Sequence, residues 1–143
     1  MTSFDTNILF YSLNPQSKWH HAARAALERS LGEDRVVLTD YVLTELYNLL
    51  RNSTVMRKPL SAPAAVETVT SYLKHPNVTR AENAPVMSEV WKAAAQPKFP
   101  RRRIFDIRLG LTLSHHGVTH FATANVKDFQ KLGFEKVWNP LLD

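Results

Sequence analysis

Two carboxylates lie on predicted helix faces that are otherwise apolar, where an ionised side chain is costly. Glu45 has Val42, Leu46 and Leu49 at the helical spacings i−3, i+1 and i+4. Asp106 has apolar residues three and seven positions further along its own predicted helix. A carboxylate in such a place is usually paired, hydrogen-bonded or bound to a metal ion. The structural alternatives are a Glu45 paired with a base at the edge of the stripe, and an Asp106 that only stabilises a first helical turn.

Two further carboxylates follow short apolar segments that read as strands. Asp5 ends the N-terminal apolar stretch, and Asp128 comes shortly after the β-like segment 118–122. Parallel strands end at one edge of a sheet, and ligands of α/β proteins bind at that edge. A helix cap at Asp5 and an exposed position at Asp128 are the structural alternatives.

Together the four carboxylates predict more than each does alone. We expect Asp5, Glu45, Asp106 and Asp128 to converge, and four neighbouring negative charges require a cation. Oxygen ligands of this kind suit Mg²⁺ or Mn²⁺. Such ions activate water and stabilise the charge that develops in phosphodiester hydrolysis.

The remaining charge favours an anionic partner. The chain has 18 Lys and Arg against 13 Asp and Glu, a net charge of +5. Arg101, Arg102 and Arg103 stand in a predicted loop, and Arg108 follows in the next helix. These four side chains are candidates for holding a nucleic-acid backbone, and a solvated basic loop is the alternative.

Alternating strand-like and helix-like segments must position these residues, which predicts an α/β fold with a parallel sheet covered on both faces. Strands are expected to end at Asp5 and to occupy 35–39, 78–79, 118–122 and 134–138. Helices are expected at 18–31, 41–51, 61–75, 84–96, 104–116 and 126–132.

Length and composition set further bounds. The 143 residues fit one domain, 1–143, and zero cysteines exclude disulfides and thiolate zinc sites. No apolar run approaches the roughly 18 residues that span a bilayer, so we expect a cytoplasmic protein without a membrane partner. Four glycines provide neither of the glycine-rich phosphate loops of nucleotide-binding proteins.

Several sequence blocks, in order along nearly the whole chain, resemble the PIN-domain ribonucleases, and among them the VapC-type toxins of bacterial toxin–antitoxin pairs. The blocks are FDTNIL, VLTELYNLLRN, IFDIRLGLTLSHHGVTHFAT, and NVKDF followed by LGF and WNP. The resemblance implies a PIN-like three-layer α/β/α sandwich with a central, mainly parallel sheet of about five short strands.

The same resemblance implies the roles of the site residues. Asp5, Glu45 and Asp106 take the places of three metal ligands, and Asp128 that of a fourth carboxylate. Thr123 and Asn125 resemble the polar residues beside it, although many family members carry an acid where Asn125 stands. Thr6 and Asn7 are expected to orient Asp5 or a metal-bound water through hydrogen bonds.

The implied activity is a Mg²⁺- or Mn²⁺-dependent endoribonuclease that cuts single-stranded or loop RNA and leaves 5′-phosphate and 3′-hydroxyl ends. A cognate antitoxin and a homodimer are implied as partners. The alternatives are a catalytically weak or inactive PIN-fold module that binds RNA or protein, and a receiver-type regulatory domain with an acidic Mg²⁺ pocket. The receiver-type alternative requires adjacent acids after the first strand, whereas this chain has the single Asp5.

Overall fold

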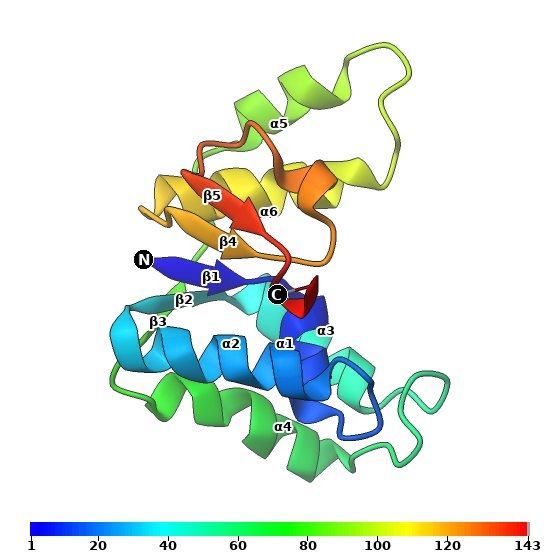
Figure 1. Ribbon diagram of the computed structural model, residues 1–143. Helices are drawn as coiled ribbons and strands as arrows, with labels where there is room; N and C mark the ends of the chain where they lie inside the picture. Colours follow the sequence, from blue (N-terminus) through cyan, green and yellow to red (C-terminus); the bar gives the residue numbers. More distant parts are fainter. Residues whose placement is uncertain (143) are drawn as a thin grey trace.

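The computed structural model describes residues 1–142 and is built around a fully parallel sheet (Figure 1). Its strand order is β3-β2-β1-β4-β5, and every neighbouring pair is parallel. The strands are β1 (Thr2–Phe4), β2 (Val36–Thr39), β3 (Val78–Ala81), β4 (His120–Ala122) and β5 (Lys136–Trp138).

The helices connect these strands as crossovers. They are α1 (Thr6–Leu13), α2 (His20–Glu33), α3 (Asp40–Leu50), α4 (Ala62–Ser71), α5 (Met87–Ala94) and α6 (Arg103–His115), with 3₁₀ turns η1 (Tyr72–Lys74), η2 (Val126–Phe129) and η3 (Pro140–Leu142). In Figure 1, α5 and α6 lie beside β4 and β5, while α1 to α4 gather on the other side of the molecule. The expected α/β/α sandwich of five short strands is confirmed.

The chain order creates a topological switch point at the centre of the sheet. After β1 the chain passes to β2 on one side, whereas after β4 it passes to β5 on the other. Connections that leave two adjacent strands in opposite directions open a crevice beyond their carboxyl ends. Asp5 follows β1 directly and Thr123 follows β4 directly, so both residues lie at this crevice.

The central strands are buried on both faces, as a covered parallel sheet requires. Every residue of β1 and β2 is buried, and Phe4 and Phe121 are fully shielded from solvent. The ring of Phe121 lies 4.6 Å from that of Phe129 and 5.3 Å from that of Phe134, between centroids. Burying an aromatic or aliphatic side chain of this size stabilises a fold by about 1.5–3 kcal/mol, so the strands form a rigid platform under the crevice.

Local capping explains where the helices around the crevice begin. Thr39 ends β2, and its hydroxyl accepts a hydrogen bond from the backbone N–H of Val42 at 3.2 Å, which starts α3. Ser61 caps α4 in the same way, with Pro63 in the first turn. The start of α3 therefore directly follows a strand end, which brings its first turns to the crevice.

Some predicted elements differ from the observed ones. The sequence did not predict α1, whose residues are buried on several sides, so that no apolar stripe marks a helix. The helix expected at 84–96 is shorter, since α5 starts at Met87 after Pro85. The helix expected at 126–132 is only the 3₁₀ turn η2, which ends at Phe129. Among the described residues, no helix is both long and apolar enough to cross a bilayer.

Candidate metal and catalytic centre

Asp5 is held firmly at the carboxyl end of β1. Its backbone N–H donates to the carbonyl of Ala122 at 2.8 Å, which extends the β1–β4 pairing by one step. The side chain caps α1 by accepting from the N–H of Thr6 at 2.8 Å, and it also accepts from the hydroxyl of Thr123 at 2.7 Å. Two charge-assisted hydrogen bonds thus fix the orientation of this carboxylate.

Glu45 reaches the same place from α3. Its Oε1 accepts a hydrogen bond from the hydroxyl of Thr6 at 2.7 Å. Thr6 therefore links two carboxylates, by its backbone to Asp5 and by its side chain to Glu45. The apolar residues Val42 and Leu46 beside Glu45 are buried in the core, so the helix cannot rotate this carboxylate away from the crevice.

Asp106 stands in the first turn of α6 and is half-buried. Burial, followed by the charges of Asp5, Asp128 and Glu45, raises the pKa of Asp106 from the usual 3.8 to about 6, while Arg103 acts in the opposite direction. Burial also raises the pKa of Asp5. The hydrogen bonds from its neighbours lower this pKa, and the charges of Glu45 and Asp128 raise it further. The four predicted carboxylates are therefore close enough to repel one another.

A cavity of about 700 Å³ joins three of these carboxylates. Asp5, Glu45 and Asp106 line it, together with Thr6, Asn7, Phe10, Tyr11, Asn14, Ser17, Tyr41, Asn48, Leu49, Val55, Leu109 and Asn125. Asp128 is half-buried on η2 just outside this lining, and its N–H donates to the carbonyl of Asn125 at 3.0 Å. Asn125 therefore lines the cavity directly. Asp128 does not line it and affects the carboxylates there only through its charge.

The donor atoms of the cavity fit a hard divalent cation that keeps part of its water shell. In residues 1–142, no three Asp, Glu or His side chains stand ready-made around one ion position, because Asp5 and Glu45 are turned towards threonine hydroxyls. Mg²⁺ usually retains several waters and binds one or two carboxylates directly. The side-chain oxygen of Asn7 is buried without a hydrogen-bond partner in the described structure, so it is available to such a hydrated ion.

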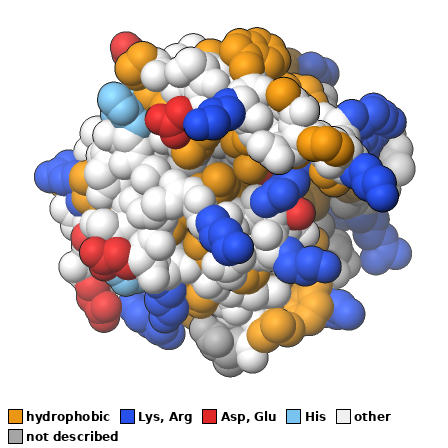
Figure 2. All heavy atoms as spheres, turned by 90° about the horizontal axis from the view of Figure 1, so that it is seen from above, with side chains coloured by type: hydrophobic (Ala, Val, Ile, Leu, Met, Phe, Trp, Pro, Cys, Tyr) orange, Lys and Arg blue, Asp and Glu red, His pale blue; other side chains and the backbone are white. Residues whose placement is uncertain are grey.

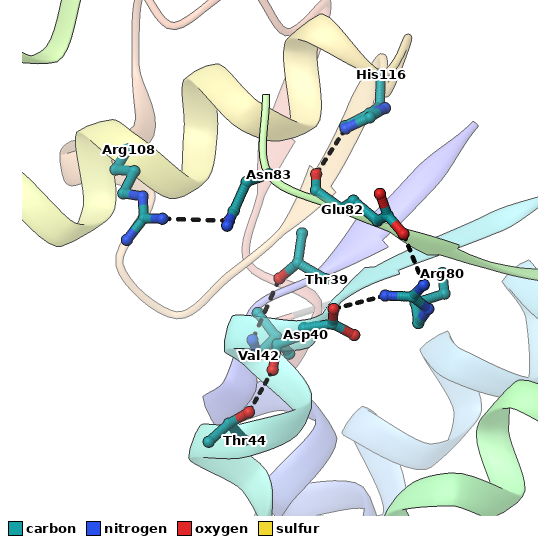
Figure 3. A network of polar contacts seen from close by, with 9 residues as sticks. All are labelled: Thr39, Asp40, Val42, Thr44, Arg80, Glu82, Asn83, Arg108 and His116. Atoms are coloured by element: carbon teal, nitrogen blue, oxygen red, sulfur yellow. Dashed lines mark hydrogen bonds and ion pairs between the residues drawn. The ribbon is translucent and has the colours of Figure 1, made fainter. Parts of the chain in front are cut away.

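The four predicted RNA-binding arginines differ in their surroundings. Arg101 and Arg102 are exposed before α6, whereas Arg103 is half-buried, with its guanidinium 6.0 Å above the ring of Phe99. Arg108 is exposed, does not line the acidic cavity and donates to the side chain of Asn83 at 3.2 Å (Figure 3).

A polar network near Arg108 positions the first turn of α3. Figure 3 shows Arg80 of β3 between Asp40 and Glu82. Its guanidinium nitrogens lie 2.6 Å from a carboxylate oxygen of Asp40 and 2.9 Å from one of Glu82. All three side chains are well exposed, so these ion pairs contribute little to stability. Their effect is to tie the end of β3 to the start of α3, next to Tyr41.

The sequence analysis missed two polar residues of α3 that share the face of Glu45. Tyr41 lies four residues before Glu45 and Asn48 three residues after it, and both line the cavity. Burial and the charges of Glu45, Asp106 and Asp5 raise the pKa of Tyr41 to about 12, so its hydroxyl stays protonated and can donate a hydrogen bond to the carboxylates. The helical spacing of Tyr41, Glu45 and Asn48 was the signal that could have found them.

The fold and this acidic crevice agree with a match to a known family. The model of the PIN domain family matches residues 3–135, and the chain belongs to this family.

Its relatives in the family are VapC proteins. Two Mycobacterium tuberculosis strains, CDC 1551 / Oshkosh and ATCC 25618 / H37Rv, each have a protein named Ribonuclease VapC24 that is 48% identical over 141 residues, covering 99% of this chain and 97% of the relative. Ribonuclease VapC48 of the CDC 1551 / Oshkosh strain is 26% identical over 140 residues and 96% of each chain. The chain is thus a VapC-type PIN domain, as the sequence blocks indicated.

Two solved structures share the fold. The crystal structure of VapC20 of Mycobacterium tuberculosis, described as a sarcin–ricin-loop-cleaving toxin, has a TM-score of 0.65 at 16% identity and covers 94% of this chain and 96% of that one. A structure of FitAB bound to a DNA fragment has a TM-score of 0.66 at 19% identity, with coverage of 99% and 96%. At these identities the likeness concerns the fold alone.

Proposed function

We propose that this protein is a metal-dependent endoribonuclease and the toxin of a type II toxin–antitoxin pair. The observation that carries the proposal is the cavity at the switch point of a VapC-type PIN domain, where Asp5 after β1, Glu45 of α3 and Asp106 of α6 line one space and Asp128 of η2 adds its charge from outside. The names of the relatives, which are ribonucleases, support RNA as the substrate class. In this proposal residues 1–143 act as one PIN domain in the cytoplasm.

The metal site uses the carboxylates that line the cavity. Asp5, Glu45 and Asp106 would hold Mg²⁺, or Mn²⁺ in its place, and Asp128 adds negative charge from the adjoining turn. When bound, the ion would lower the pKa of a water molecule and stabilise negative charge on the phosphate.

The neighbouring polar residues hold these carboxylates in place. The hydroxyls of Thr123 and Thr6 orient Asp5 and Glu45 by the hydrogen bonds described above. Asn7 and Asn125 present amide groups to the cavity, where they would hold ordered water. Hydrogen bonds that hold Asp5 and Glu45 in place lower the cost of organising these two carboxylates around the substrate.

The reaction is a hydrolysis of the RNA backbone. Oxygen from water bonds to phosphorus, the bond from phosphorus to the 3′ oxygen breaks, and that oxygen takes up a proton. The products carry a 5′-phosphate and a 3′-hydroxyl. Arg101, Arg102, Arg103 and Arg108 are exposed or half-buried cations around the start of α6, and they would hold the single-stranded or loop RNA electrostatically.

Two protein partners complete the proposal. The relatives are VapC proteins, and we infer from them a cognate antitoxin that blocks the cavity until it is removed. A homodimer is the assembly that we expect for the toxin itself.

Cleavage of a fluorescent single-stranded RNA panel with Mg²⁺, Mn²⁺ or EDTA tests this function. Asp5→Asn keeps the shape of the side chain and removes its charge, and Glu28→Gln removes an exposed carboxylate of α2 as the matched control. We expect metal-dependent cleavage by the wild type and the control, and a loss of at least about 100-fold in Asp5→Asn, as for an essential electrostatic group. RNA binding without any cleavage above the Asp5→Asn background would favour the inactive binding module instead.

A further inference from the structure

A second pocket is lined by Arg103 and Ile107 of α6, next to the face of this helix whose residues Asp106 and Leu109 line the acidic cavity. Its volume is about 370 Å³, and it is formed where the segment joining α5 to α6 meets the segment that follows η2. The apolar floor includes Phe99, Ile107 and Leu132. The two walls are some thirty positions apart in the sequence and form one pocket only in the folded chain.

The side chains around this pocket form an electropositive rim. Lys98, Arg103 and Lys131 line it together with the amides of Gln96 and Gln130, and no Asp or Glu is among its lining residues. None of these three cations forms a salt bridge among the described residues, although the charge of Arg103 also acts on Asp106. Three cations around one depression attract an anion. Figure 2 shows this face of the molecule, where Lys and Arg side chains gather over the half that carries the segment joining α5 to α6.

Arg103 carries an unused hydrogen-bond donor at this place. Its Nε is buried and has no partner within the described residues, and its guanidinium lies over Phe99. A buried donor left unpaired costs about 1–3 kcal/mol. Phosphate oxygens are well matched to a guanidinium, which can donate two parallel hydrogen bonds to them.

The two lysines occupy backbone positions that suit other residues better. Lys98 and Lys131 both have φ of 63°, and they are the only non-glycine residues with positive φ in the described chain. Glycine or asparagine adopts this conformation more easily than lysine. The presence of lysine at both positions therefore indicates a use for the charged side chain.

The pocket adjoins the acidic cavity through both of its walls. Arg103 begins α6 three residues before Asp106, and Lys131 comes three residues after Asp128. Three residues of helix advance by about 4.5 Å, so a strand of RNA whose scissile phosphate lies at the carboxylates can also reach this pocket.

We propose that the pocket formed around Lys98, Arg103 and Lys131 binds a backbone phosphate of the RNA substrate beside the one that is cut. This inference rests on the proposed ribonuclease function and adds the site that holds the flanking strand. Phosphate is favoured over an acidic peptide because the pocket lies next to the carboxylates that would bind the scissile group. The pocket therefore increases affinity for RNA longer than a dinucleotide, without taking part in bond cleavage.

RNA binding in EDTA, where no cleavage occurs, tests the proposal directly. The probe is a fluorescein-labelled single-stranded RNA, and its Kd is measured by anisotropy over a range of salt concentrations. The variant is Lys98→Asn/Lys131→Asn, since asparagine removes the charge and accepts the positive φ. The control is Lys74→Asn, which removes an exposed lysine on η1, away from the pocket. We expect the double variant to bind more weakly, with a salt slope smaller by about 0.7 for each RNA phosphate that the protein no longer neutralises.

Steady-state cleavage in Mg²⁺ adds a second readout. In the double variant, KM for the longer RNA should rise at nearly unchanged kcat, whereas cleavage of a dinucleoside phosphate should stay at the wild-type rate. Equal RNA binding by the double variant and the wild type would overturn the proposal. An equally large loss of RNA affinity in Lys74→Asn would also overturn it. The same holds if the double variant keeps its RNA affinity and only binds the antitoxin more weakly. Failure of the wild type to cut any RNA would instead refute the proposed function, and the binding measurement in EDTA still decides on the pocket.

Discussion

Asp106→Asn should make the metal-free protein more stable at neutral pH, although it should abolish the activity proposed above. In the folded chain Asp106 ionises among three other carboxylates, so burial and repulsion raise its pKa to about 6 from the usual 3.8. Asparagine keeps the shape of the side chain without this cost. This electrostatic cost of ionising Asp106 applies only to the metal-free protein, in which no cation offsets the repulsion between the carboxylates.

The size of the effect follows from that shift in pKa. A rise of about 2 units corresponds to about 3 kcal/mol at 1.36 kcal/mol for each unit. Asp106 is only half-buried, so screening by water leaves about 1–2 kcal/mol of this. The variant also loses the favourable interaction of a first-turn acid with the helix dipole, a few tenths of a kcal/mol or more. A net gain of about 1 kcal/mol corresponds to a Tm that is about 2–4 °C higher.

The pH dependence distinguishes this cause from a general change in packing. The folded-state pKa lies above the unfolded one, so below about pH 4 both states are protonated and the penalty is absent. As the pH rises from about 4 to about 6, Asp106 ionises in the unfolded chain but stays protonated in the folded one. The wild type therefore loses stability relative to the variant over this range. Above about pH 6 the difference is constant.

Thermal unfolding by circular dichroism in EDTA between pH 4 and pH 8 measures this difference, with Glu28→Gln as the control. Adding Mg²⁺ at pH 7.5 should raise the Tm of the wild type more than that of Asp106→Asn, because binding to the folded state stabilises it. A gain of the same size at pH 4 and pH 7.5, or a variant less stable than the wild type at every pH, would refute the electrostatic reasoning.

Three further changes probe the surroundings of the site. Thr6→Val removes the hydroxyl that donates to Glu45, and we expect metal affinity and kcat to fall about 10- to 100-fold in Mn²⁺ binding and cleavage assays, with the Tm nearly unchanged. Asn125→Asp adds a carboxylate to the cavity, so calorimetry should show tighter Mn²⁺ binding, and melting in EDTA should show a lower Tm. Gly110→Ala places a methyl group 2.4 Å from Cδ1 and 3.3 Å from Cβ of Leu132. Denaturant unfolding should therefore show a free energy of unfolding that is lower by about 1–3 kcal/mol. An unchanged denaturation midpoint would mean that the Leu132 segment moves freely.

The sequence predicted the elements that end at the crevice better than those that surround it. Asp5 could be placed at a strand end because an apolar run stops there, and Glu45 stood out because its helical neighbours are apolar. Helix α1 gave no such signal, since Thr6, Ile8, Leu9, Phe10 and Ser12 are all buried and no polar face alternates with them.

The hydrogen bonds and the second pocket could not be predicted, because they join distant segments. The hydrogen bond from Thr123 to Asp5 spans 118 residues, and the pocket joins Arg103 to Lys131. Neither leaves a local pattern in the chain. Tyr41 was missed for another reason: it is neutral, and only the position of Glu45 gives its spacing a meaning.

The central claim is that the carboxylates at the switch point share a divalent cation that the nuclease needs. Binding of Mn²⁺ at pH 7.5, measured by electron paramagnetic resonance, tests this claim most directly in the wild type, Asp5→Asn, Asp106→Asn and Glu28→Gln. We predict saturable binding by the wild type and Glu28→Gln, and affinities lower by about tenfold or more in Asp5→Asn and Asp106→Asn, which corresponds to at least about 1.4 kcal/mol of binding free energy. Equal Mn²⁺ affinity in all four proteins, or no binding by the wild type, would contradict the claim.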